Sequence, residues 1–314
     1  MKVLKITMVV TLILLISVTA ATAKKTSVAL VMPGVVTDQS WNQFAYEGLM
    51  AAKNECDLEV AYSEKVSQDE QVEVFRQYAL EGYDIIIGHG GEYAVSIKQV
   101  AGEFPKIEFG NSNGFEKAPN LSNYIVSFAH MGYVSGCLAG MMTKTGKVAE
   151  ISAMPLPIVK QGEEAFKRGV KDVNPNAEVT FVTTGSWEDV TKAREAALAL
   201  IAAGNDVLTY HLDTAEVGVI SACEDKGVYV IGTYRDVSKI APKAVIGSAL
   251  GSPATLVHEL ACGRALTHGS SFLDVHSAQG PVDMACTDLV PKDIQKKMKE
   301  IVKKMRTGEI DVAH

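Results

Sequence analysis

The sequence lacks the motifs that mark most metal- and nucleotide-dependent enzymes. It contains no H-E-x-x-H, no Walker loop and no G-x-G-x-x-G after a predicted strand. Its five cysteines are scattered, with no C-x-x-C and no Cys/His cluster at zinc spacing. No metal and no cofactor are therefore expected, and positive evidence for catalysis is absent, so we expect a protein that is not an enzyme.

Long apolar runs are also missing, except at the N-terminus. Residues 1–23 ("MKVLKITMVVTLILLISVTAATA") contain a basic start, an apolar stretch and an A-x-A site, which together predict a secretory signal peptide cleaved after Ala23. The alternative is a retained membrane anchor, although the run is at the short edge of the roughly 20 residues that a span needs. No Cys follows the predicted cleavage site, so we expect a periplasmic protein without a lipid anchor.

Positive charge is scarce in the predicted mature chain. Without residues 1–23 it has 28 basic and 37 acidic residues, a net charge of −9. Nucleic acids and anionic membrane surfaces both favour clustered Lys and Arg, so neither is an expected partner. The lysine-rich stretch near the C-terminus, "KKMKEIVKKMR", carries apolar residues at helical spacing and predicts a solvated amphipathic helix.

The odd number of cysteines leaves at least one free thiol in an oxidising compartment. They are Cys56, Cys137, Cys223, Cys262 and Cys286. We expect most of them to be small buried hydrophobic residues. Whether any two form a disulfide stays open.

What the chain does contain is an internal repeat with an offset near 120 residues. The stretch "ALEGYDIIIGH" (79–89) matches "LIAAGNDVLTYH" (200–211), so that Gly82 corresponds to Gly204 and Asp84 to Asp206. Three further pairs match in the same order: "VALVMP" with "VAEISAMP", "DLEVAYSEK" with "NAEVTFVTT", and "PKIEFGN" with "VYVIGTY". The repeat predicts two similar lobes.

Helical patterns separate these short apolar runs. They cover Trp41–Asn54, Asp69–Leu80, Glu92–Glu103, Val159–Val173, Asp189–Ala203 and Thr214–Lys226. Strands that alternate with helices predict βαβ units and parallel sheets with right-handed crossovers. The expected fold class is α/β, with two lobes around a ligand cleft.

The expected lobes are discontinuous in sequence. Residues 24–127 plus about 249–283 form the N-terminal lobe, and residues 128–248 plus about 284–314 form the C-terminal lobe. The segment from 249 to 288 is too short for a third domain and is expected to join the lobes. Ligands of parallel sheets bind outside the carboxyl ends of the strands, so the loops after each strand are the candidate site.

In the first half, aromatic and polar residues follow two predicted strands. Trp41 and Asn42 fall on the first turn of a helix; Trp offers a flat face to a ring, and Asn offers a donor and an acceptor. Tyr93, with Glu92 beside it, follows the glycine-rich loop "GHGG". The alternatives are core packing for Trp41 and Tyr93 and a helix surface position for Asn42.

In the second half, the candidate ligand contacts are Trp187, His211, Asp213, Tyr234 and Asp236. All five follow predicted strands. Core packing is the alternative for Trp187, and capping or plain exposure is the alternative for the others. Both tryptophans of the chain thus fall in loops that face the expected cleft, one in each lobe, which favours a ring held between aromatic faces.

The chain resembles the basic membrane protein/purine nucleoside-binding family, which comprises substrate-binding proteins of ABC transporters. The resemblance covers essentially the whole predicted mature chain. It is carried, in order, by Asp38-x-Ser40-Trp41-Asn42 and by "LEGYDIIIGHGGEY", "GCLAGMMTKTGKVAEIS", "GVKDVNPNAEV", "GSWEDVTKAREAALALIAAGNDVL", "KGVYVIGTYRD" and "LVPKDIQKKMKEIVKKMRTGEIDV".

The resemblance implies a type I periplasmic-binding-protein fold with a hinged cleft, a purine-type ligand and a membrane permease as partner. It implies a stack on Trp41 and purine-edge hydrogen bonds from Asn42. Nucleoside binders of the family usually carry an Asp and a Lys that serve the ribose. Here those places look like "IGTYRD", with Thr233 and a later Asp236, and "GSALGS", which has no Lys. This departure favours a bare purine base.

Other functions stay open at this point. A purine nucleoside is the second ligand class, and a ligand-sensing receptor with the same fold is a second role. An exported nucleoside hydrolase would need a carboxylate cluster, which the sequence does not suggest. Sugar sites usually carry more Arg and Asp at strand ends, whereas Arg235 is the only Arg in these loops.

Overall fold

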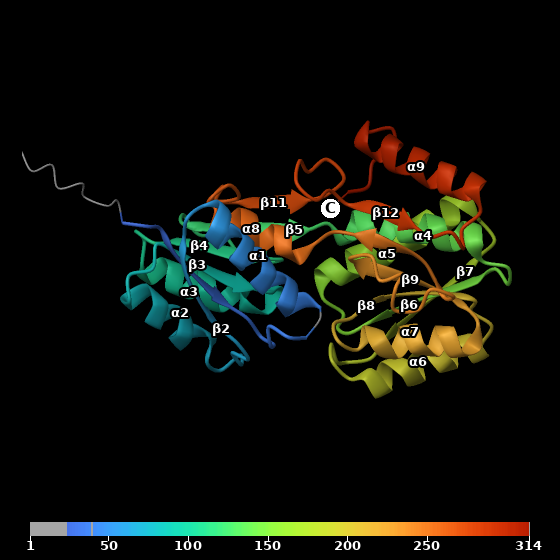
Figure 1. The fold of residues 1–314 in the computed structure, drawn as a ribbon, viewed down its shortest axis with the longest axis horizontal. Coiled ribbons are helices and arrows are strands. Elements are labelled where there is room, and N and C mark those ends of the chain that lie inside the picture. The colour runs from blue at the N-terminus through green and yellow to red at the C-terminus, as the bar shows by residue number, and fades with distance from the viewer. Residues whose placement is uncertain (1–23, 39, 314) are drawn as a thin grey trace, which may run out of the picture.

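The protein folds into two α/β lobes that lie side by side (Figure 1). The computed structural model describes residues 24–38 and 40–313; the predicted signal peptide lies outside the described residues. The predicted α/β class and the two-lobed architecture are confirmed. No described helix is both long and apolar enough to cross a membrane.

Strands and helices alternate along most of the chain. The strands are β1 (Ser27–Val31), β2 (Glu59–Ser63), β3 (Ile85–His89), β4 (Glu108–Ser112), β5 (Leu121–Val126), β6 (Lys147–Ser152), β7 (Glu178–Thr183), β8 (Val207–His211), β9 (Tyr229–Tyr234), β10 (Val245–Leu250), β11 (Ser270–Leu273) and β12 (Asp283–Cys286). The helices are α1 (Trp41–Glu55), α2 (Gln71–Leu80), α3 (Ala94–Glu103), α4 (Phe128–Met142), α5 (Pro157–Val173), α6 (Val190–Ala202), α7 (Glu216–Lys226), α8 (Pro253–Ala261) and α9 (Lys292–Arg306), with a 3₁₀ turn η1 (Gly91–Tyr93) before α3.

The two sheets have equivalent strand orders. The N-terminal sheet runs β11-β5-β4-β3-β1-β2 and the C-terminal sheet runs β12-β10-β9-β8-β6-β7. All neighbouring strands are parallel except β10 and β12, which pair antiparallel. Each sequence pair of the repeat supplies strands at equivalent positions, β1 with β6, β2 with β7, β3 with β8 and β4 with β9.

The matched glycine and aspartate of the repeat have matched structural roles. Gly82 (φ 80°) and Gly204 (φ 95°) both follow a helix in the left-handed region that favours glycine. The Asp84 carboxylate accepts hydrogen bonds from the Ser27 N–H and hydroxyl at the start of β1. The Asp206 carboxylate accepts from the N–H groups of Lys144 and Thr145, just before β6. Each lobe thus ties its first strand to the strand beside it.

Helices cover both faces of each sheet. In the N-terminal lobe, Val28 and Leu30 of β1 pack in one core with Leu49 of α1 and Leu260 of α8. The intervening residues of β1 pack in a second core beneath α2 and α3. In the C-terminal lobe, α4 and α5 cover one face and α6 and α7 the other. Burial on both faces explains why the strands lack a polar alternation.

Helices α4 and α8 are absent from the helical patterns found in the sequence. All but one residue of α4 is buried, so the helix has no polar face and no amphipathic period. Glycines bring α4 against α5: a Cβ at Gly132 would lie 2.3 Å from the Gly162 carbonyl oxygen, and one at Gly136 would lie 2.1 Å from that of Phe166. The close approach leaves no room for a side chain at these positions.

A disulfide links Cys56 to Cys262, with a Cα–Cα distance of 5.8 Å. These residues follow the last turns of α1 and α8, which pack side by side so closely that a Cβ at Gly48 would lie 2.2 Å from the Ala254 carbonyl oxygen. Among the described residues, Cys137 and Cys223 are buried free thiols and Cys286 is half-buried. The question that the sequence left open is therefore answered by the packing of α1 on α8.

Candidate functional site

A cavity of about 590 Å³ lies between the lobes and is lined by loops from both. Most of the lining residues follow β1, β3, β4, β6, β7 and β8, which is where parallel sheets place ligands. Five aromatic side chains contribute to the walls: Trp41, Phe115, Phe128, Trp187 and Tyr234. Of the eight residues predicted from the sequence, the structure places Trp41, Asn42, Trp187, Asp213 and Tyr234 at this cavity.

Trp41 presents a ring that is supported from behind. It stacks on His89 at 4.3 Å with an interplanar angle of 21°. His89 Nε2–H donates to the Trp41 carbonyl oxygen (3.0 Å), and its Nδ1 accepts from the Ser112 hydroxyl (2.7 Å). Complete burial lowers the pKa of His89 to about 3, so the ring is neutral and both nitrogens are used. The hydrogen bonds of His89 fix its ring, and the stack on that ring fixes the orientation of Trp41.

The Ser112–His89 pair is structural although its spacing resembles a nucleophile site. Ser112 lies in "GNSNG" (110–114), which has the G-x-S-x-G spacing of a nucleophile elbow. Both side chains are fully buried. Because His89 Nε2 is bound to a carbonyl and the pKa of His89 is low, this histidine is a poor general base.

Asn42 lines the cavity but its amide is already engaged. Its Nδ2 donates to Asp38 Oδ2 (2.7 Å), and its Oδ1 accepts from the Gly34 N–H (3.2 Å). Asp38 also accepts from the N–H groups of Ser40, Asn42 and Gln43, so its carboxylate caps the N-terminus of α1. Asn42 and Asp38 together fix the loop that carries Trp41.

Asp213 connects the two lobes at the edge of the cavity. Its Oδ1 accepts from the Trp41 N–H of the other lobe at 3.1 Å. Burial, with the nearby Asp38 carboxylate as the next cause, raises the pKa of Asp213 to about 7. Its own N–H donates to the Trp187 carbonyl oxygen (3.1 Å), so the loops after β7 and β8 are held together.

Tyr234, the last residue of β9, completes an aromatic group that spans the lobes. Its ring lies 5.7 Å from that of Trp41 and 6.1 Å from that of Phe128, tilted in both cases. Its backbone has a φ of 68°, which is uncommon for a residue other than glycine. Strain of this kind often occurs at ligand sites.

The structure places the other three predicted residues away from the cavity wall. Tyr93 is fully buried in the N-terminal lobe, where its hydroxyl donates to the Val66 carbonyl oxygen at 3.0 Å and its ring meets Phe75 edge-on. Glu92 occupies the cavity wall beside it. Asp236 is exposed and accepts from the Ser238 N–H in a turn (2.9 Å).

His211 lies beneath the cavity. It is 2% exposed, and its Nδ1 is 2.8 Å from Oε1 of the buried Glu150 on β6. Its ring stacks on Phe128 at 4.7 Å, so that Phe128 separates it from the cavity. The pairing with Glu150 depends on β6 and β8 being neighbours, which no local sequence pattern reveals.

Two aromatic side chains and one carboxylate on the cavity wall were not among the predicted residues. Phe115 and Glu188 follow strands and were reachable by the same strand-end argument. Phe128 begins α4, whose pattern gave no helix signal. Among the described residues, no group of three or more His, Cys, Asp or Glu side chains is arranged to hold a metal ion.

Comparisons with known proteins agree with this architecture. The family model described as ABC transporter substrate-binding protein PnrA-like matches residues 25–312. A transcriptional activator protein of Bacillus subtilis is 28% identical over 98% of this chain and 98% of its own length. A purine-binding protein of Brucella abortus is 29% identical over 81% of this chain and 73% of its own length.

Solved structures show the same fold. The crystal structure of a transcriptional activator of the comK gene from Bacillus halodurans has a TM-score of 0.78 and 25% identity, covering 92% of this chain and 100% of that one. An ABC transporter solute-binding protein from Aeropyrum pernix has a TM-score of 0.79 at 18% identity, covering 91% and 92%. Since the family model spans nearly every described residue, the chain belongs to the family of PnrA-like ABC transporter substrate-binding proteins.

Proposed function

We propose that this protein binds a purine base in the interlobe cleft, outside the cytoplasmic membrane, and delivers it to the permease of an ABC importer. The observation that carries the proposal is the set of aromatic side chains from both lobes around one cavity, with the Asp213 carboxyl group at its edge. Each aromatic partner adds about 0.5–1.5 kcal/mol beyond area burial when it stacks on a ring.

A base is favoured over a nucleoside because the cavity lining lacks the Asp and Lys that the resemblance associates with ribose binding. Thr233, at the place where the resemblance puts a ribose-binding Asp, is 2% exposed and does not line the cavity. Asp236 lies in an exposed turn. Within the described residues, no Lys lines the cavity. The purine-binding relative supports the ligand class but not the choice between base and nucleoside.

The cavity volume keeps the nucleoside as a second candidate. A cavity of about 590 Å³ falls in the range of about 300–1,000 Å³ that holds drug-sized ligands, which leaves space beyond a bare base. A sensing role is a further candidate, because a transcriptional activator of Bacillus subtilis aligns with this chain over 98% of both lengths.

Thermal unfolding of residues 24–314, refolded to remove any bound ligand, tests the proposal. The panel contains purine and pyrimidine bases and their nucleosides. A ligand at 100 times its Kd stabilises the folded state by about 2.7 kcal/mol, which gives a clear rise in Tm. A rise with purine bases alone supports the proposal, a rise with nucleosides alone replaces the base with a nucleoside, and no rise with either overturns the purine assignment.

A further inference from the structure

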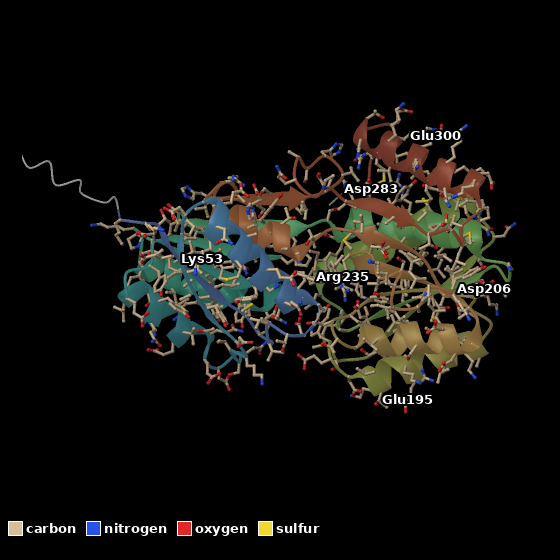
Figure 2. The ribbon with its side chains drawn as sticks, in the orientation of Figure 1. Lys53, Glu195, Asp206, Arg235, Asp283 and Glu300 are labelled. Carbon is tan, nitrogen blue, oxygen red and sulfur yellow. A yellow bond between two sulfur atoms is a disulfide. The ribbon has the colours of Figure 1, made fainter. Side chains whose placement is uncertain are left out.

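The charged groups on the cavity wall all have the same sign. Glu92 comes from the N-terminal lobe, and Glu188 and Asp213 come from the C-terminal lobe. No Lys or Arg among the described residues lines the cavity. The cation that follows β9, Arg235, instead lies over the Phe44 ring (5.2 Å) and 3.4 Å from Glu216. Figure 2 shows Arg235 on the side of its lobe that faces the other lobe.

Glu92 has no charged partner within the described part of the chain. Its carboxylate folds back over Gly90, where a Cβ would lie 2.2 Å from Glu92 Oε2, and Gly90 has a φ of 130°. The positive φ favours glycine at this position, and the Glu92 carboxylate fills the space beside it. Although part of Glu92 is exposed, desolvation at the cavity wall raises its pKa, and the hydrogen bond from its own backbone N–H opposes the shift.

The aromatic walls and the carboxylates select the same kind of ligand. The face of an aromatic ring attracts a cation, and an ionised carboxylate only accepts hydrogen bonds. Both repel an anion or a ligand that presents only acceptors. The Asp213 carboxylate accepts from the Trp41 N–H and interacts with the Ser40 side chain, and its remaining lone pairs can accept from a donor on the ligand.

Building on the proposed purine function, we infer that the cleft selects heterocycles that present N–H donors or a positive charge and excludes anionic ones. The preferred purines are amino-substituted, with Glu92 and Asp213 accepting from opposite lobes. Ionised oxopurines and nucleotides are excluded, because each would place a negative charge among three carboxylates.

Calorimetric titration of the refolded residues 24–314 at pH 8 tests this selection. The probes are adenine, hypoxanthine, urate and AMP, together with 1-methylnicotinamide and nicotinate, a cationic and an anionic form of one ring. We expect adenine to bind at least tenfold more tightly than hypoxanthine, and urate and AMP not to bind. Glu92→Gln should reduce the preference for adenine at least fivefold. Glu195→Gln, on α6 away from the cavity (Figure 2), is the matched control and should change nothing.

The outcomes separate the inference from the proposed function. If urate or hypoxanthine binds as tightly as adenine, or if Glu92→Gln leaves the ratio unchanged, the inference is overturned while the purine function stands. If no purine binds but 1-methylnicotinamide binds better than nicotinate, the purine function fails and the charge selection stands. If nicotinate binds as well as 1-methylnicotinamide, or if no probe binds, the charge selection fails.

Discussion

The two lobes share one strand order, and in each a pair of helices packs closely through glycine, but the N-terminal pair also carries a disulfide. In the N-terminal lobe, α1 and α8 come from distant parts of the chain and are joined covalently by Cys56–Cys262, 206 residues apart. In the C-terminal lobe, α4 and α5 are neighbours in sequence and are packed through glycines that admit the backbone of the partner helix. The disulfide limits the freedom of the unfolded chain, whereas the glycine contacts, which α1 and α8 also make at Gly48, depend on close packing in the folded state.

The largest loss of stability is expected from placing a side chain at a glycine in the contact between α4 and α5 of the C-terminal lobe. Gly136→Leu should lower the free energy of unfolding by about 3 kcal/mol or more, because the new side chain meets the Phe166 carbonyl at once. Chemical denaturation measures the change. The control is Gly102→Ala on α3, where a Cβ meets nothing within 4 Å and a stabilisation of about 0.5–1 kcal/mol is expected. Equal effects of the two variants would show that α4 and α5 are not tightly packed.

Removing the disulfide should have the next largest effect, and in the other lobe. The double variant Cys56→Ala, Cys262→Ala should lose about 2–4 kcal/mol of stability, since the unfolded chain regains the freedom of a long loop. A reductant should lower the Tm of the parent protein and leave that of the variant unchanged. If the Tm of the parent protein is the same with and without the reductant, a structural role for this disulfide is contradicted.

The tryptophan that each lobe contributes to the cavity, Trp41 or Trp187, can be compared by its effect on ligand binding. Trp41→Ala should weaken the binding of the purine identified in the thermal panel by about 2 kcal/mol, roughly thirtyfold, because it removes a central aromatic contact. Trp187→Ala should weaken it less, because the Trp41 ring is fixed by its stack on His89 and by its contact with Tyr234 and offers the better ordered face to a ligand. Tyr62→Ala, on the N-terminal lobe and outside the cavity, is the control. Full-strength binding by Trp41→Ala would remove the stacking role.

The smallest expected effect is a dependence of stability on pH that differs between the lobes. Burial raises the pKa values of Asp213 and Glu216, both to about 7. The folded state therefore holds more protons than the unfolded state, and the stability from these groups, complete below the usual carboxylate pKa, is lost as pH rises through about 7. The groups facing them are Asp38, Glu188, Arg235 and the Tyr210 hydroxyl.

For Asp84, in the N-terminal lobe, the sign is opposite. Hydrogen bonds from Ser27 lower the pKa of Asp84, so its contribution is present above the usual carboxylate pKa and is lost in acid. We expect Tm to fall by a few degrees between pH 5.5 and pH 8, and Asp213→Asn to flatten that slope. Asp84→Asn should leave the slope over this range unchanged. A Tm that rises over the range would contradict the assignment to Asp213 and Glu216.

The fold and the site could be predicted from the sequence where a feature leaves a pattern along the chain, and not where it depends on packing between distant segments. Four strand pairs were visible because they recur in the chain, and the strand-end rule then located Trp41, Trp187 and Asp213 near one cavity. Helix α4 was missed because burial on all sides removes the amphipathic pattern. Tyr93 is adjacent to the residue that does line the cavity, and sequence alone cannot separate the orientations of two neighbours in a 3₁₀ turn.

The chain order of the N-terminal lobe has a consequence for the timing of folding. Its sixth strand, β11, comes from residues 270–273, and Cys262 supplies one end of its disulfide. The C-terminal sheet likewise waits for β12 at 283–286. A chain that emerges from its N-terminus therefore completes neither sheet until nearly all of it has emerged. Both lobes are then finished almost together, and the N-terminal half spends most of synthesis without its last strand.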